Sequence, residues 1–119
     1  MKSPHLERAK DALQHRNVDA ILSTYEEPFV FEDMPSGQKI DNREDLRAYF
    51  QALFALPNVA FSDIRVYETE TFAVLEWTWS GTKRSSGEGY QVRGASVIEL
   101  RNGRIAREAI YYDPRTPLM

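Results

Sequence analysis

The sequence of 119 residues contains no cysteine, which excludes disulfide bonds, thiolate catalysis and cysteine-based metal centres. It also lacks a block of one charge: acidic and basic residues are interspersed and the formal net charge is -3. That balance does not indicate a basic surface that would bind nucleic acid or an anionic membrane. No apolar run approaches the roughly 18 residues of a membrane span, and the first residues lack a signal-peptide stretch. We therefore expect a soluble cytoplasmic protein.

Histidine is also scarce, because the chain has two, His5 and His15. They lie in the same predicted helix but ten residues apart. Metal ligands on one helix face are usually three or four residues apart. We therefore expect no metal site here, and neither histidine is a candidate catalyst.

The first half of the chain has the periodicity of helices. Apolar side chains recur at helical spacing over residues 6–13, 18–25 and 46–54, with charged residues between them. Asn17 and Asn42 stand where the side chain of an N-cap residue would begin the second and third helices. The sequence therefore predicts three helices before residue 57.

Strand patterns occupy most of the rest. The apolar alternation changes to a period of two, with many β-branched and aromatic residues, in the segments 29–33, 59–68, 71–82, 90–101 and 104–113. Asn102-Gly103 is a strong signal for a two-residue hairpin. Helices followed by a run of strands are typical of an α+β fold.

The strand 71–82 is apolar on both faces. Trp77 and Trp79 share one face with Leu75, and the opposite face carries Phe72 and Val74. One face should meet the helices, and the other is expected to pack on a second copy of the chain, giving a homodimer. The two tryptophans indicate either a packed core or a ligand pocket, with equal weight.

Six pieces of the chain also occur in a familiar order and spacing: Asn17–Tyr25, Phe29–Gly37, Asp45–Phe50, Trp77–Thr82, Gly103–Ile105 and Ile110–Asp113. Together they resemble the SnoaL-like polyketide cyclase and ketosteroid isomerase group of the nuclear transport factor 2-like superfamily. The resemblance covers about residues 5–113. It implies that residues 1–119 form one domain, a cone in which a curved antiparallel or mixed sheet wraps around N-terminal helices and an apolar pocket. The superfamily includes both enzymes and binding proteins, so the fold does not decide the function.

The resemblance points to two catalytic candidates. Asp33 matches the general base of ketosteroid isomerases, and a partly desolvated aspartate could accept a proton from a carbon acid. The alternative is a turn residue whose side chain bonds the backbone before Gly37. Asp113 matches the late aspartate that acts as acid/base in SnoaL-like cyclases. Its alternative is a strand-ending residue that caps the turn at Pro114 or pairs with an arginine.

Several positions depart from the family pattern. Ala9 and Ser96 stand where ketosteroid isomerases carry the tyrosine and the acid that bind the oxyanion. Phe50 replaces a further tyrosine, although Tyr49 is adjacent, and Lys83 replaces a histidine of the cyclases. Neither chemistry is therefore expected to apply unchanged.

Strand parity and the resemblance together predict the residues that contact a small, flat, hydrophobic or aromatic ligand: Tyr25, Tyr49, Phe54, Leu75, Trp77, Trp79, Ser96, Ile98, Ile110 and Tyr112. Glu76 and Glu108 flank them, and each could be a polar group in the cavity or part of a surface ion pair. The sequence favours a cofactor-independent isomerase, cyclase or dehydratase. A non-catalytic ligand-binding protein and a dimeric assembly module remain as alternatives.

Overall fold

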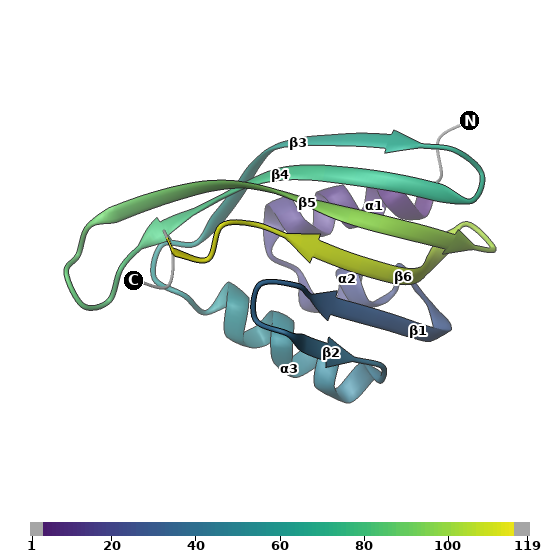
Figure 1. The fold of residues 1–119 in the computed structure, drawn as a ribbon, viewed down its shortest axis with the longest axis horizontal. Helices are drawn as coiled ribbons and strands as arrows, with labels where there is room; N and C mark the ends of the chain where they lie inside the picture. The colour runs from purple at the N-terminus through teal and green to yellow at the C-terminus, as the bar shows by residue number, and fades with distance from the viewer. Residues whose placement is uncertain (1–3, 116–119) are drawn as a thin grey trace.

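The structure is a computed structural model that describes residues 4–115 (Figure 1). Three helices and six strands follow one another in the order α1 (Pro4–His15), α2 (Val18–Leu22), β1 (Tyr25–Asp33), β2 (Gln38–Ile40), α3 (Arg43–Phe54), β3 (Ala60–Glu68), β4 (Phe72–Thr82), β5 (Gly89–Arg101) and β6 (Arg104–Tyr111). Among these residues, none of the helices combines the length and the apolar character needed to cross a membrane.

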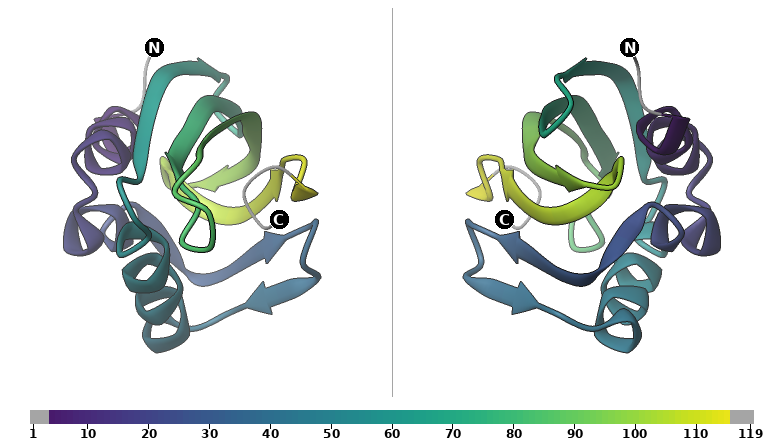
Figure 2. Two further views of the ribbon diagram at one scale, coloured as in Figure 1. Left: turned by 90° about the vertical axis from the view of Figure 1, so that its left-hand side faces the viewer. Right: turned by 90° about the vertical axis from the view of Figure 1, so that its right-hand side faces the viewer.

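The strands within residues 4–115 form one sheet in the order β2-β1-β6-β5-β4-β3, in which β1 and β6 run parallel and the other neighbouring pairs run antiparallel. The sheet is strongly curved but not closed, and the helices lie along one side of it (Figure 2). This arrangement confirms the predicted α+β fold with a curved mixed sheet. The β1–β6 pairing brings the end of the first strand beside the end of the last strand, so residues far apart in sequence can share a site.

The helix beginnings match the predicted caps. The side-chain oxygen of Asn17 accepts the N–H of Ala20 at 3.1 Å, and that of Asn42 accepts the N–H of Asp45 at 2.8 Å. The end of the second helix was predicted wrongly, because α2 stops at Leu22 rather than continuing to Tyr25. The hydroxyls of Ser23 and Thr24 each donate to a helix carbonyl at 2.6 Å, and such local bonds compete with continued helix.

The strand β2 was not predicted. Only its last residue, Ile40, is buried, so its sequence has no apolar alternation. It pairs with β1 at the sheet edge, with Ile40 opposite Phe31 and Gln38 opposite Asp33. The turn that precedes it was predicted, and Gly37 takes a φ of 76° there, which glycine adopts without steric cost.

The last hairpin has the predicted turn. Asn102 and Gly103 both have positive φ, 56° and 74°, as a type I′ turn requires. Arg101 and Arg104 pair on either side of it. This turn starts the long β5–β6 pairing that carries much of the candidate site.

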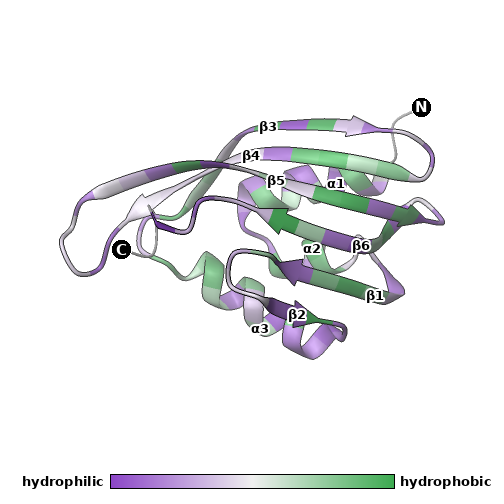
Figure 3. Ribbon diagram, in the orientation of Figure 1, coloured by the Kyte–Doolittle hydropathy of each residue, from purple (hydrophilic) through white to green (hydrophobic). Residues whose placement is uncertain are grey.

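The inner face of the sheet carries the core. Ala73, Leu75, Trp77 and Trp79 of β4 are all buried, which confirms the predicted helix-facing side, and Figure 3 shows apolar residues along the central strands. Trp77 lies over Gly94 of β5, where an added Cβ would be 2.3 Å from the indole ring. Glycine at this position is therefore what allows the indole to lie against β5.

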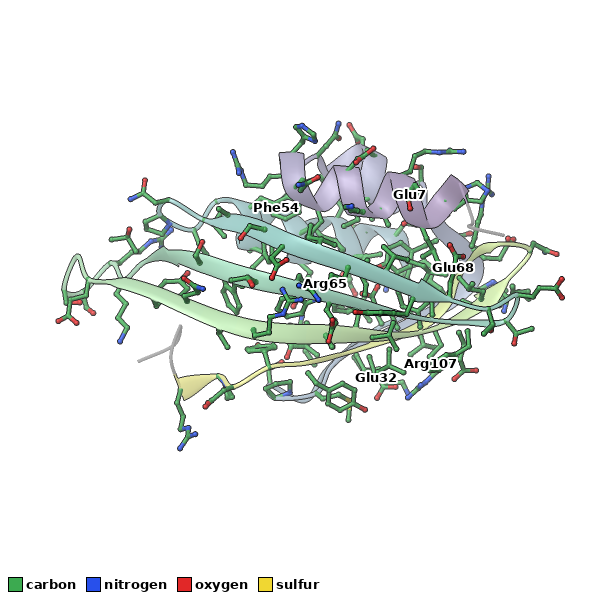
Figure 4. The ribbon with its side chains drawn as sticks, turned by 90° about the horizontal axis from the view of Figure 1, so that it is seen from above. Glu7, Glu32, Phe54, Arg65, Glu68 and Arg107 are labelled. Atoms are coloured by element: carbon green, nitrogen blue, oxygen red, sulfur yellow. The ribbon has the colours of Figure 1, made fainter. Side chains whose placement is uncertain are left out.

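The outer face of the sheet is mixed. Arg107 of β6 forms ion pairs with Glu32 and Glu99 at 3.3 and 3.2 Å, and Figure 4 shows Glu32 and Arg107 together on the side away from α1. Glu76 lies 3.6 Å from Arg93, so it belongs to a surface ion pair. Exposed aromatic side chains on this face and at its margins are Tyr67, Phe72 and Tyr111. The homodimer stays a prediction.

Candidate functional site

Asp33 ends β1 and is the most buried aspartate of the site, with 4% of its surface exposed. The Tyr49 hydroxyl donates to its Oδ2 at 2.9 Å, and the Tyr112 hydroxyl lies 3.1 Å from both carboxyl oxygens. The backbone N–H of Ser36 also donates to Oδ1 at 3.3 Å. Asp33 is therefore both a turn residue and a buried carboxyl group held by two tyrosines from distant parts of the chain.

The two tyrosines remain protonated at neutral pH. Burial raises the pKa of the Tyr49 hydroxyl well above its ordinary value, and the charge of Asp33 and their hydrogen bond add to the shift. The pKa of Tyr112 is raised for the same reasons, with burial again first. Both hydroxyls are thus lasting donors to the Asp33 carboxyl group.

Two voids meet beside these tyrosines. An open cleft of about 490 Å³ runs between α3, β2 and the ends of β1 and β4, with Asp33 in its lining. An inner cavity of about 50 Å³ lies between the helices and the sheet. Both are lined by Tyr49, Leu53, Trp79 and Tyr112. The cleft is large enough for a small organic ligand, whereas the cavity has room for a few waters or one end of a ligand.

The predicted contact residues gather around the inner cavity. All of them except Phe54 line it: Tyr25, Tyr49, Leu75, Trp77, Trp79, Ser96, Ile98, Ile110 and Tyr112. Phe54 packs against the rings of Phe50 and Phe61, with centroids 5.7 and 6.0 Å away. From the sequence, a packed core and a ligand pocket had equal weight. The structure has a largely packed interior that encloses a small cavity. Ligand binding by these residues stays a prediction.

One buried donor at the junction of the two voids lacks an acceptor. The Nε1–H of Trp79 makes no hydrogen bond among residues 4–115. The ring of Tyr90 packs edge-on against Trp79 at 5.9 Å between centroids, and its hydroxyl approaches Nε1 without reaching bonding geometry. An acceptor atom of a ligand at the junction would satisfy this N–H.

Glu108 of β6 is a polar group of the inner cavity that the sequence left undecided. It is 6% exposed, accepts a very short hydrogen bond from the Tyr25 hydroxyl and has the Ser96 hydroxyl close enough to affect its pKa. Ser96 in turn accepts the indole N–H of Trp77 at 3.1 Å. Burial raises the pKa of the Glu108 carboxyl group, although the bonds from Tyr25 and Ser96 oppose that shift.

Asp113 lies apart from this group. It is absent from the lining of both voids, and its carboxylate is bound by Arg115, with Nη2 at 2.7 Å and Nε at 3.0 Å. Hydrogen bonds from Arg115 lower its pKa to about 2. The geometry is that of the arginine-paired alternative, and an acid/base role for Asp113 stays a prediction.

The positions that depart from the family pattern divide into two groups. Ala9, Phe50 and Ser96 line the inner cavity. The tyrosines and the acid that the family pattern has at these three positions are therefore absent from the cavity lining. Lys83 lies in the loop between β4 and β5, where its backbone bonds Glu88. No cluster of three or more metal-ligating side chains occurs in the described part of the chain.

The structure is thus a small α+β domain in which a curved sheet packs against helices and a buried carboxyl group lines an open cleft. The sequence profile of the SnoaL-like domain matches residues 6–108, and the chain belongs to that family. No protein of curated function matches it.

Solved structures show the same fold. A protein with a ketosteroid isomerase-like fold from Catenulispora acidiphila, in complex with trimethylamine, is 17% identical with a TM-score of 0.84, over 99% of this chain and 92% of that one. A "putative polyketide cyclase" from Pseudomonas putida is 18% identical with a TM-score of 0.81, over 98% and 95%. An NTF2-like protein from Burkholderia thailandensis is 17% identical with a TM-score of 0.83, over 98% and 95%.

Proposed function

We propose that this protein is a cofactor-independent enzyme that moves a proton on a small, mainly apolar organic molecule bound in the cleft, with Asp33 as the base. One observation carries the proposal: a buried carboxyl group, bonded by two tyrosine hydroxyls, lines the open cleft, and both tyrosines also line the inner cavity. Acid/base chemistry needs a carboxyl group within reach of the substrate, and the cleft brings a substrate to Asp33.

The chemistry follows from the partners of Asp33. One carboxylate oxygen takes a proton from a carbon next to a carbonyl group, and the C–H electrons move onto the carbonyl oxygen as an enolate. Tyr49 and Tyr112 fix the direction of the carboxyl group during this step. Return of the proton from Asp33 to a different carbon gives isomerisation. Its transfer to a hydroxyl group on the next carbon, which then leaves as water, gives dehydration. Attack of the enolate carbon on a second carbonyl group, whose oxygen takes the proton, gives cyclisation.

The proposal needs Asp33 and not Asp113. The relatives support this reaction class, since one is described as a "putative polyketide cyclase" and another has a ketosteroid isomerase-like fold. They do not name a substrate for this chain. The cleft lining is mixed, since it includes the aromatic rings of Tyr49, Trp79 and Tyr112 as well as the polar residues Gln38, Lys39 and Asp45, which suits an apolar molecule with a polar group.

A non-catalytic ligand-binding protein of the same fold is the second candidate. It is favoured by Ala9, which leaves one side of the inner cavity without a donor. A ligand that copurifies unchanged, together with a lack of proton exchange on related compounds, would support this alternative.

The proposed step can be tested without knowing the substrate. Purified protein is incubated in D₂O with cyclohexanone and related small ketones, and NMR follows the replacement of the α-hydrogens by deuterium. General-base catalysis is worth about 10²–10⁴-fold, so Asp33→Asn is expected to lose exchange by at least about 100-fold. Asp19→Asn is the matched control, because Asp19 forms an exposed ion pair with Arg47 at 2.6 Å and lines neither void. Equal exchange by wild type and Asp33→Asn would remove Asp33 as the base.

A further inference from the structure

A connected chain of polar groups lies inside an otherwise apolar cavity. The indole of Trp77 donates to Ser96 at 3.1 Å, the Ser96 hydroxyl neighbours the Glu108 carboxyl group, and the hydroxyl of Tyr25 donates to Glu108. All four side chains are buried and line the cavity. We call them the Glu108 cluster. The base at Asp33 makes no use of it.

The number of hydrogens in the cluster does not match the number of its bonds. With Glu108 neutral, the four side chains carry four hydrogens on nitrogen or oxygen, one each. Two hydrogen bonds use one hydrogen each, Trp77–Ser96 and Glu108–Tyr25, and the contact between Ser96 and Glu108 can use one more. At least one hydrogen is therefore left over, whichever way the hydroxyl groups turn. A buried donor without an acceptor costs about 1–3 kcal/mol.

The ionised cluster would have balanced bonds but an uncompensated charge. None of the described residues that line the cavity is lysine, arginine or histidine. The titratable groups near Glu108 are Tyr25 and Tyr49, with Asp33 further along β1, and none of them supplies a positive charge. A buried carboxylate without a cation is strongly disfavoured, so burial in this cavity favours the neutral form of Glu108.

We propose that the Glu108 cluster is a subsite that donates its spare hydrogen bond to one acceptor oxygen of an uncharged ligand, such as a ketone, ester or lactone. This rests on the proposed function in one respect, since the body of the ligand lies in the cleft whose lining is shared with the cavity. The cavity, at about 50 Å³, admits a carbonyl end rather than a whole ring. The subsite thus selects molecules with an acceptor at one end and rejects those that end in a cation.

The protonation of Glu108 is measured first, by infrared difference spectroscopy between wild type and Glu108→Gln. A protonated carboxyl group has a C=O stretch separate from that of a carboxylate. We expect this band at neutral pH in wild type and in Glu76→Gln, whose glutamate is in a surface ion pair. It should be absent from Glu108→Gln. A wild-type protein without the band at neutral pH overturns the inference.

Ligand binding is measured next with two probes of similar shape. Cyclohexanone has an acceptor oxygen, and cyclohexylammonium has only donors and a charge. Cyclohexanone should shift the Glu108 band to lower frequency and cyclohexylammonium should leave it in place. A band that neither probe shifts shows that the cluster binds water alone and overturns the subsite.

The pH dependence of cyclohexanone binding adds a quantitative check. Ionisation of Glu108 removes the spare hydrogen, so affinity should fall about tenfold per pH unit above its pKa. Glu108→Gln keeps a neutral donor, and its affinity should not vary with pH in that range. A pH dependence that survives in Glu108→Gln would contradict the assignment.

Failure of the subsite and failure of the proposed enzyme are separable. Asp33→Asn should lose deuterium exchange and keep the band shift with cyclohexanone. If the band shift is found and exchange is absent in wild type, the subsite stands and the enzyme proposal falls. If exchange depends on Asp33 and the band does not shift, the reverse holds.

Discussion

The stability of this fold should decrease with rising pH because of Glu108. A carboxyl group whose pKa is raised on folding keeps its proton in the native state when the unfolded chain has already lost it. Burial is the main cause of the raised pKa, and the ordinary value of 4.5 marks the lower end of the pH window. Below that value both states are protonated and the contribution is complete.

The slope of the effect follows from proton linkage. Between the unfolded and the folded pKa, the native state holds one more proton than the unfolded state. The free energy of unfolding therefore falls by about 1.4 kcal/mol per pH unit. The loss stops once the pH passes the folded pKa, because both states are then ionised. Because burial raises the folded pKa, the stabilisation is lost as the pH rises. A salt-bridged carboxylate, whose folded pKa is lowered, loses its stabilisation as the pH falls.

Urea unfolding from about pH 5 to about pH 8 measures this slope. Trp77 and Trp79 are both buried and provide the fluorescence signal. Glu108→Gln cannot ionise at this position. The slope of its unfolding free energy against pH should therefore lack the contribution of one proton that wild type shows. Glu76→Gln removes a carboxylate from the surface and should retain the wild-type slope. Parallel pH profiles for wild type and Glu108→Gln would refute a raised pKa at Glu108.

Three further substitutions test, by urea unfolding, the contacts that hold the elements around the site in place. Gly94→Ala places a methyl group 2.3 Å from the indole of Trp77 and should cost about 1–3 kcal/mol, with a changed tryptophan fluorescence; an unchanged spectrum and stability would contradict the close packing. Asn42→Ala removes the cap of α3 and should cost about 1 kcal/mol, whereas Asn42→Asp should cost less. Arg43→Met removes donors to two backbone carbonyls at 2.7 and 2.9 Å and should cost about 1–3 kcal/mol; stability equal to wild type would show that the two bonds are not formed in solution.

Much of the fold was predictable because its signals are local. The N-caps Asn17 and Asn42 and the Asn102-Gly103 turn depend on side chains and backbone angles within a few residues. The alternation in 71–82 gave the correct inner face, because successive strand residues point to opposite sides. The end of α2 failed for an equally local reason. The bonds of Ser23 and Thr24 to the preceding carbonyls end the helix, while the apolar stripe continues to Tyr25.

The site was predictable in its residues but not in its volumes. Parity decides which side chains face inward, and this places most of the predicted contact residues around one cavity. It does not decide how completely those side chains fill the space, which depends on rotamers and on contacts between elements. The larger cleft escaped prediction because it needs β2, a strand of three residues without an apolar pattern.

Glu108 shows which information was missing. Alternation counted back from Tyr112 and Ile110 puts Glu108 on their inner face. Register counted from the hairpin, where Arg101 faces Arg104, would instead set Glu108 opposite Val97 on the outer face of β5. The pairing shifts by one residue between Glu99 and Leu100, and Glu108 then faces Ile98. Such a bulge exchanges the two faces of all residues beyond it.

That shift also restores a carboxyl group to the site. The family resemblance expects an acid at position 96, where this chain has a serine. Beyond the bulge, Ser96 faces Ile110, and Glu108 lies two residues away on the same side of β6, within hydrogen-bonding reach of Ser96. A comparison along the sequence finds the acid missing, whereas the strand pairing shows a carboxyl group supplied by the neighbouring strand. The strand pairing thus places a carboxyl group beside the position where the resemblance expects one.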